Sequence, residues 1–537
     1  MNIQKRLVFF LVLILLSFGL IIYRLFTLSY LKHSSYRELA QNQEKYGNFS
    51  SRRGDLFIKD QADDKLVTAA TTKKKYYAYF TPNSISNPDE VINKIIGIVN
   101  LDPDKTLDLI TDSKSGFKIL SEDLTFNQIE QIKSLNIKGV QIGVKNERFY
   151  PQHELASDVI GFLGFKGDQR VGQYGVEGFY DQSLKNQAQS LVLTVDSNIQ
   201  FFVEEKLKQV IEKWQAQSGS VIVQDPKTGA ILAMADFPNF NLNEYGKYEL
   251  ERFINSNIQE IFEPGSSFKP ITMAGAIDSG LLKPQSTYYD PGFVELAGYR
   301  LKNFDEKSHG LQTMNQVLEK SLNTGAIHAS KLMGSSKFLA YIEAFGFGRK
   351  TDIDVFGEVS GDISNLYLKR PINFATASFG QGIAVTPIQL INGYSSIANG
   401  GKQMKPYIIE ELVLKNGDRI KTQPRVISRP ISEASGRTLR SMLVSVVDRG
   451  FDKARIKGYE IAGKTGTAQI PNKDKEGYSD EFIHNFVGFA PANDPRFTVL
   501  LKIDRPKGIK FAADSLSPVF GEISRFLINY YSIPPTR

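Results

Sequence analysis

The strand patterns beyond residue 190 lie at the two ends of a long, mainly helical stretch. Residues 191–195 are typical of a buried strand, and a hairpin pattern follows at 218–224 and 230–235. Helical segments alternate with Gly- and Pro-rich turns before further strand patterns at 485–490 and 497–503 and a last helix near 518–530. This order predicts an α+β fold with an antiparallel sheet flanked by helices, and not a doubly wound parallel sheet.

A helix is predicted directly after the strand at 191–195. Ser197 and Gln200 have the spacing of a capping box, and the apolar residues from Ile199 to Trp214 share one stripe. Residues 52–190 instead mix short strand and helix patterns, and residues 30–50 are polar. We therefore expect a domain boundary near 191, with a stalk and non-catalytic domain at 30–190 and a larger domain at 191–537.

Composition excludes several classes of function. The chain has 537 residues, which is too long for one ordinary core and predicts two or more domains. A net charge of +7 is modest for this length, and the lack of long Lys/Arg runs argues against nucleic-acid binding. The absence of cysteine excludes disulfides and thiolate chemistry, and the five histidines lack metal-ligand spacing. We expect neither a metal nor another cofactor.

An apolar run at residues 7–23 follows Lys5 and Arg6 and ends before Arg24. At about 1.5 Å per residue, a helix of this length is roughly 26 Å long, just enough to cross a bilayer. A cleaved signal peptide is the alternative, but no small-residue cleavage site follows the run. We expect a membrane anchor within residues 1–29, with essentially all of the protein on the far side of the cytoplasmic membrane.

The string SSFK at 266–269 follows a turn and begins a helix pattern. Ser266 would lie near the helix N-terminus, and Lys269, three residues later, would stand on the same face. A desolvated lysine can take the proton of a serine nucleophile, whereas Ser267 would point elsewhere. Alone, the string occurs by chance in many proteins of this size, and a capping serine with an exposed lysine is then the better explanation.

Two further strings complete a possible acyl-transfer site. In SLN at 321–323, Ser321 could pass a proton to a leaving group, and Asn323 could orient Lys269 or hold a substrate amide; a helix-ending turn is the alternative. In KTGT at 464–467, within a strand pattern, Lys464 adds positive potential, and the hydroxyls of Thr465 and Thr467 can bind a carboxylate. Gly466 would let a ligand backbone approach closely. The backbone N–H groups of Thr467 and Ser266 could hold an oxyanion.

The same letters recur at Lys227-Thr228-Gly229, but there they follow Asp225-Pro226 inside a hairpin turn. A turn explains them sufficiently, and we assign them no catalytic role.

The three strings, in this order, resemble those of the penicillin-binding and serine β-lactamase superfamily. Upstream strings, among them RFYP at 148–151, GFLG at 161–164 and GVEG at 175–178, resemble class B penicillin-binding proteins, and the resemblance runs from about 53 to 526. RGD at 53–55 matches the start of the first upstream box, but QADD at 61–64 departs from it. The segment from Gly348 to Glu358 is closer to division-type than to elongation-type members.

The resemblance implies a single-pass anchor, an elongated α+β pedestal and a C-terminal transpeptidase domain outside the cytoplasmic membrane. It implies a D,D-transpeptidase that cross-links peptidoglycan stem peptides ending in D-Ala-D-Ala. Ser266 would be the acylated nucleophile and Lys269 its base, assisted by Ser321 and Asn323. The 464–467 segment would bind the terminal carboxylate. β-Lactams would acylate the serine, and the implied partners are a polytopic peptidoglycan glycosyltransferase and other divisome or elongation proteins.

Two alternatives remain open from the sequence. The same acyl-enzyme could be hydrolysed, as in a D,D-carboxypeptidase or a β-lactamase. The anchor and the large pedestal argue against a dedicated β-lactamase, which needs neither. A non-catalytic β-lactam sensor or wall-assembly scaffold could also retain the fold.

Overall fold

The computed structural model describes residues 3–27, 52–102, 105–108, 118–167, 169–187, 189–450, 452–472 and 477–537. The polar segment at 30–50, predicted to be a stalk, lies outside the described residues. The chain forms two compact units. One comprises Met1–Arg53, Thr72–Phe149 and Phe165–Arg170, and the other comprises Gly54–Thr71, Tyr150–Gly164 and Val171–Arg537.

Helix α1 spans Ile3–Phe26 and contains the apolar run. Among the described residues, no helix has the combined length and apolar character that crossing a membrane requires.

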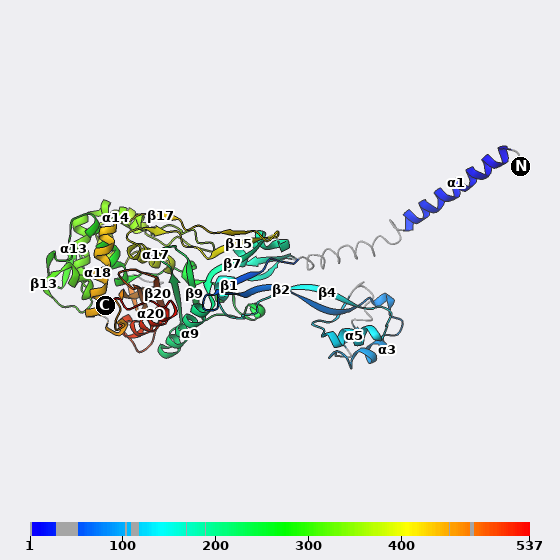
Figure 1. Cartoon of the computed structure of the whole chain (residues 1–537), viewed down its shortest axis with the longest axis horizontal. Coiled ribbons are helices and arrows are strands. Elements are labelled where there is room, and N and C mark those ends of the chain that lie inside the picture. Colours follow the sequence, from blue (N-terminus) through cyan, green and yellow to red (C-terminus); the bar gives the residue numbers. More distant parts are fainter. Residues whose placement is uncertain are drawn as a thin grey trace. The chain divides into compact units, whose positions relative to one another are not determined.

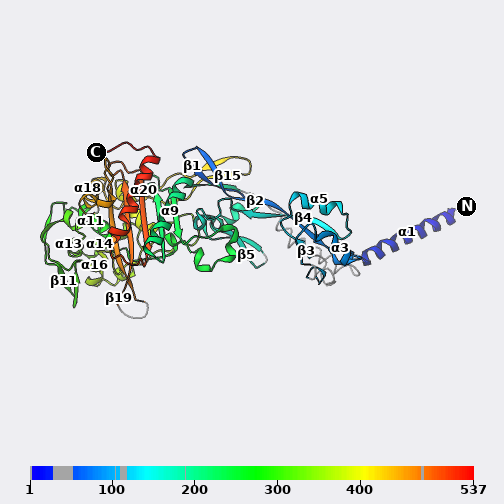
Figure 2. The ribbon, with the colours of Figure 1, turned by 90° about the horizontal axis from the view of Figure 1, so that it is seen from below.

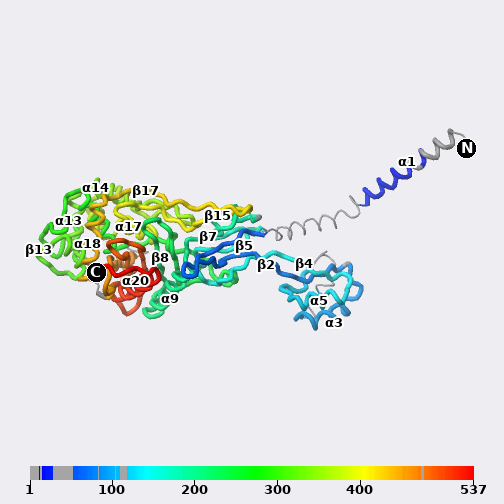
Figure 3. Tube along the Cα trace, viewed as in Figure 1, coloured from blue at the N-terminus to red at the C-terminus, as the bar shows by residue number. Residues whose placement is uncertain are grey.

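The first unit has its own small core. The second half of β2 (Lys65–Phe80) pairs with β3 (Lys118–Ser121) and with β4 (Val140–Phe149). Helices α3 (Pro88–Ile95) and α5 (Phe126–Ser134) pack near these strands in Figure 3 and bury Ile95, Ile129 and Ile132 with Phe80. Strand β2 is 16 residues long, and part of it also belongs to the second unit.

The second unit contains a mixed sheet and an antiparallel one. In the mixed sheet, β1 (Leu56–Asp60) pairs in parallel with β7 (Gln189–Asp196), and β15 (Ile409–Leu414) pairs antiparallel with β7 on its other side. The first half of β2 pairs antiparallel with β1. Residues 54–71 therefore belong to the compact unit that contains the C-terminal region, because their strand is hydrogen-bonded to β7 (Figure 1).

The antiparallel sheet has five strands in the order β18-β19-β20-β8-β9. Their bounds are β8 (Ser218–Gln224), β9 (Ile231–Phe237), β18 (Ala462–Pro471), β19 (Tyr478–Ala490) and β20 (Phe497–Asp504). Each neighbouring pair is antiparallel. The predicted α+β class with an antiparallel sheet is confirmed, and β20, the last strand of the chain, pairs with β8 inside this sheet.

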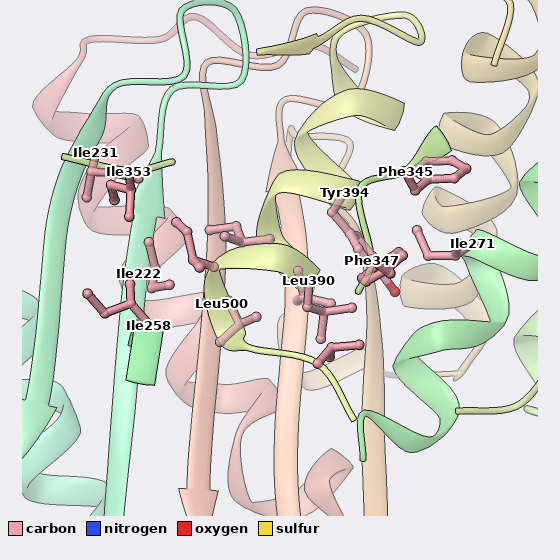
Figure 4. Close-up of a cluster of buried hydrophobic side chains, with 14 of the residues drawn as sticks. Ile222, Ile231, Ile258, Ile271, Phe345, Phe347, Ile353, Leu390, Tyr394 and Leu500 are labelled. Carbon is pink, nitrogen blue, oxygen red and sulfur yellow. The ribbon is translucent and has the colours of Figure 1, made fainter. Parts of the chain in front are cut away.

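Helices cover both faces of this sheet. On one face, α9 (Ser197–Trp214) and α20 (Ser517–Tyr530) lie side by side and bury alternate strand residues such as Val221 and Val499 (Figure 2). On the other face, α17 (Pro387–Ala398) places Leu390 near Leu500 of β20, and its Tyr394 lies beside Phe347 (Figure 4). This alternation is the period of two expected for a sheet buried on both sides.

The other α-helices that the structure describes in the second unit are α6 (Ser157–Ile160), α7 (Gly175–Phe179), α8 (Asp181–Leu184), α10 (Ser256–Gln259), α11 (Lys269–Asp278), α12 (Met314–Glu319), α13 (Asn323–Met333), α14 (Ser335–Ala344), α15 (Ser364–Tyr367), α16 (Pro371–Ala377), α18 (Glu433–Gly450) and α19 (Ala512–Ser515). The remaining strands are β5 (Phe162–Lys166), β6 (Gln169–Gln173), β10 (Thr287–Asp290), β11 (Phe293–Leu296), β12 (Tyr299–Lys302), β13 (Gly310–Thr313), β14 (Gln403–Met404), β16 (Arg419–Lys421) and β17 (Val426–Ser428).

The predicted capping box at the start of α9 is wrong. The N-cap is Asp196, whose carboxylate accepts hydrogen bonds from the backbone N–H groups of Asn198 and Ile199. Gln200 instead forms two buried hydrogen bonds with the backbone of Met234 on β9. Because that pairing satisfies a strand from a distant part of the chain, local spacing alone could not reveal it.

Candidate active site

Ser266 lies in a tight turn that leads into α11. The turn is a single 3₁₀ segment, Gly265–Phe268, and it starts with Gly265 in the left-handed region (φ 58°). The Gly265 N–H donates to the Gly380 carbonyl at 2.9 Å, which ties the turn to the 378–382 segment. Ser267 is buried and donates to the Pro264 carbonyl at 2.9 Å, whereas Ser266 stays half-buried. Of the two serines, Ser266 is therefore the one that a ligand can reach.

Lys269 is enclosed and faces two serine hydroxyls. Its side chain is 1% exposed, and its Nζ lies 3.0 Å from Ser266 Oγ and 3.1 Å from Ser321 Oγ. Nζ also donates to the Ser321 backbone carbonyl. Burial, and then the positive charge of Lys464, hold the pKa of Lys269 well below its ordinary value. A lowered pKa favours the neutral amine, and a neutral amine can accept a proton from a hydroxyl.

Ser321 reaches this lysine from the connection between α12 and α13. It has a left-handed backbone (φ 59°), which is uncommon for a residue other than glycine. Asn323 begins α13, and its side-chain amide donates to the Lys302 carbonyl at 2.8 Å. This hydrogen bond joins Asn323 to the end of β12. The sequence alone offers Lys269 as one possible partner of Asn323.

Strand β18 carries the third string along an edge of the five-stranded sheet. Lys464 is fully buried, and burial lowers its pKa to about 7. Its Nζ donates to the Thr465 carbonyl at 3.2 Å. Thr467 Oγ1 accepts a hydrogen bond from the Ala512 N–H at 3.1 Å, so its own hydroxyl hydrogen can serve another acceptor.

Gly466 lies against other parts of the protein. A Cβ atom there would lie 2.4 Å from the Pro264 carbonyl oxygen and 2.5 Å from the Asn485 side-chain nitrogen. Asn485 in turn donates to the same Pro264 carbonyl at 3.1 Å. Gly466 therefore allows β18 to approach the turn at Gly265–Phe268.

These elements meet at one cleft of about 210 Å³. Its lining includes Ser266, Ser321, Thr465 and Thr467, together with Asn303, Phe304, Asp305, Lys320, Leu322, Phe511 and Ala513. Four of the eight predicted site residues thus line the cleft. Lys269 does not line it but contacts Ser266 and Ser321, which do. Lys464 and Gly466 lie within the adjoining strand, and Asn323 is directed toward Lys302.

Sequence reasoning missed the aromatic wall of the cleft. Phe304 and Phe511 come from segments more than two hundred residues apart, and their rings meet edge to face with centroids 4.9 Å apart. Neither phenylalanine lies in one of the three strings, so only the folded structure shows that both line the cleft. The 378–382 segment, whose Gly380 carbonyl holds the turn at Gly265, is marked in the sequence as a turn by Gly380 and Gly382.

Two exclusions can be compared with the structure. Residues 225–229 form the expected turn, closed by the Gly229 N–H donating to the Asp225 carbonyl at 2.8 Å. Within the described residues, no group of three His, Asp or Glu side chains is arranged to hold a metal ion.

Two family models match the sequence. The penicillin-binding protein transpeptidase domain matches residues 219–525, and the penicillin-binding protein dimerisation domain matches residues 50–223. The chain belongs to the penicillin-binding protein transpeptidase family. The family predicted from the three strings is thus confirmed, and so is the enzyme class, since relatives are named peptidoglycan D,D-transpeptidases.

This penicillin-binding protein is similar to several characterised ones. It is 31% identical to stage V sporulation protein D of Bacillus subtilis over 100% of this chain and 87% of that protein. It is 30% identical to peptidoglycan D,D-transpeptidase FtsI of Escherichia coli over 79% of this chain and 74% of that protein.

Solved structures agree with this assignment. The crystal structure of penicillin-binding protein 3 from Mycobacterium tuberculosis in complex with aztreonam matches with 25% identity and a TM-score of 0.72. That match covers 91% of this chain and 98% of the crystallised one. The apo form matches with 30% identity and a TM-score of 0.68, over 73% of this chain and 92% of that one.

Proposed function

We propose that this penicillin-binding protein cross-links peptidoglycan by D,D-transpeptidation, with Ser266 as the nucleophile. The observation that carries the proposal is the position of Lys269 Nζ, 3.0 Å from Ser266 Oγ and 3.1 Å from Ser321 Oγ, in a buried site that favours its neutral form. A neutral amine between two hydroxyls can collect a proton from one and deliver it through the other.

The reaction has an acylation step. Lys269 takes the proton as Ser266 Oγ attacks the carbonyl carbon of the penultimate D-alanine of a donor stem peptide. The backbone N–H groups of Ser266 and Thr467 stabilise the resulting oxyanion. As the C–N bond breaks, Ser321 passes the proton from Lys269 to the amine of the departing D-alanine. The donor remains bound to the enzyme as a serine ester.

In the second step, an amine of another stem peptide attacks this ester. The amine transfers a proton to Lys269, and the proton returns to Ser266 Oγ when the ester bond breaks. The products are a new peptide cross-link and the regenerated serine. A β-lactam carbonyl would enter the same first step, but its ring nitrogen stays tethered to the acyl group after the amide bond breaks.

The terminal carboxylate of the donor would bind along β18. The Thr465 and Thr467 hydroxyls donate to it, and Lys464 supplies positive charge from behind the strand. Burial lowers the pKa of Lys464 to about 7, so near neutral pH this lysine is only partly protonated. A carboxylate that binds nearby favours the protonated form. Asn323 would position the substrate through the connection to Lys302, and Gly466 would keep the strand close to the nucleophile turn.

The remaining assignments concern location and partners. Residues 191–537 would be the transpeptidase domain and 30–190 the pedestal. Residues 1–29 would anchor the chain in the cytoplasmic membrane with the catalytic domain outside, because large apolar side chains such as Leu16, Phe18 and Leu20 of α1 are exposed. By resemblance around 348–358, the role would be in septal wall synthesis beside a polytopic glycosyltransferase and other divisome proteins.

Fluorescent penicillin tests the nucleophile. Labelling should stop in Ser266→Ala and persist in Ser267→Ala, whose hydroxyl is engaged inside the turn. A labelled Ser266→Ala protein with the adduct on another residue would refute the assignment. With a D-Ala-D-Ala peptide and an acceptor amine, cross-linked product is expected; free acid as the sole product would identify a hydrolase, and labelling without turnover would identify a sensor.

A further inference from the structure

A buried histidine lies on β19, the strand next to β18, which would bind the donor carboxylate. His484 is on β19, directly opposite Thr467 of β18 in the antiparallel register. Directly opposite residues of an antiparallel pair place their side chains on the same face of the sheet. His484 is fully buried, and its Nδ1 lies 2.9 Å from Ser515 Oγ at the end of α19.

The short helix α19 connects this histidine to the cleft. The Ala512 N–H at its start donates to Thr467 Oγ1 at 3.1 Å, and Phe511 and Ala513 line the cleft. The histidine and threonine that face each other on the sheet are therefore joined a second time, through the 511–515 segment. A movement of this segment would change both the cleft wall and the partner of the Thr467 hydroxyl.

We propose that His484 is a positioning residue for the Thr467 hydroxyl, acting through Ser515 and the 511–515 segment. The inference rests on the proposed function, in which Thr467 binds the donor carboxylate. When Ala512 donates to Thr467 Oγ1, one lone pair of the hydroxyl is occupied, which restricts its hydrogen to the remaining directions. The contact between His484 and Ser515 holds the segment where Ala512 can make this bond.

His484 is suited to a fixed structural contact and not to proton transfer. Burial lowers the pKa of His484 to about 4, although the Lys510 backbone acts in the opposite direction. The ring is therefore neutral near neutral pH and keeps one donor and one acceptor nitrogen. An asparagine amide can place a polar atom near the position of Nδ1, so His484→Asn should retain part of the function that His484→Ala loses.

The test compares the acylation rate constants of the full-length protein for a penicillin and for its neutral methyl ester. His484→Ala and Ser515→Ala should each lower the penicillin-to-ester ratio about five-fold, the effect of misdirecting one ordinary hydrogen bond. Ser515→Ala opens little space, so it decides the question if His484→Ala fails to fold. Ser524→Ala is the matched control, because Ser524 is also a buried helical serine but has no hydrogen-bond partner among the described residues.

The Thr467→Ala background separates positioning from general packing. There, Ser515→Ala should cause no further drop in the ratio, because the hydroxyl that the segment positions is already absent. Equal losses for penicillin and ester, or a full additional drop in the Thr467→Ala background, would overturn the inference. A wild-type protein that penicillin does not acylate would instead refute the proposed function.

Discussion

Replacing Lys464 by methionine should stabilise the protein while weakening carboxylate binding. Lys464 is fully buried, and burial lowers its pKa from 10.5 to about 7. At 1.36 kcal/mol per pKa unit, holding this lysine in the folded protein at about pH 7 costs about 4 kcal/mol. Methionine has a similar length and no charge, so Lys464→Met should recover up to about 4 kcal/mol of unfolding free energy there.

The sign of the pH dependence follows from the direction of the shift. Because the folded pKa lies below the unfolded one, the unfolded chain binds more protons between about pH 7 and pH 10.5, and wild-type stability rises with pH over that window. The advantage of Lys464→Met should therefore shrink by about 2 kcal/mol between about pH 7 and pH 9. Urea unfolding followed by the fluorescence of Trp214, the single tryptophan, reports on the second unit.

Lys502 supplies the matched control. It is equally buried, but its Nζ lies 2.7 Å from the Asp504 carboxylate. Burial lowers the pKa of Lys502, yet Asp504 and Glu260 outweigh it, so the net shift is upward. Lys502→Met should destabilise by about 3 kcal/mol, because it leaves a buried carboxylate without its partner. A Lys464→Met protein that is less stable than wild type, or whose advantage does not change with pH, would refute the reasoning.

Three further outcomes are expected. Acylation by a neutral penicillin ester should rise with pH through the pKa of Lys269, and Lys464→Met should move this limb to higher pH by removing a neighbouring positive charge; an unmoved limb would contradict the coupling. Gly466→Ala should reduce the acylation rate at least about ten-fold, because the added Cβ would displace the Pro264 carbonyl and with it the turn at Gly265–Phe268. An unchanged acylation rate would contradict this prediction. Tyr394→Phe should cost about 1–2 kcal/mol in urea unfolding, since its buried hydroxyl donates to the carbonyl of the residue after the nucleophile, and a neutral result would mean that water replaces the bond.

Local spacing was sufficient where the structure is local. The hairpin at 218–235 and the last helix appear within two residues of the predicted bounds, because strand alternation, turn residues and helical periodicity act over short distances. The contact between Lys269 and Ser266 is of the same kind, since three residues bring two side chains onto one face of a helical turn. The sequence therefore predicted that Lys269 lies beside Ser266.

Only the tertiary structure decided how these parts act together. Ser321 meets Lys269 across 52 residues of sequence, and the low pKa of that lysine depends on the enclosing core and on Lys464 from a third segment. The spacing of Ser197 and Gln200 predicts a local capping box, and no short-range pattern shows that Gln200 hydrogen-bonds to Met234 instead. The order and chemistry of the strings were readable in the sequence, whereas burial and long-range hydrogen bonding, which depend on the whole fold, set the protonation and orientation of each side chain.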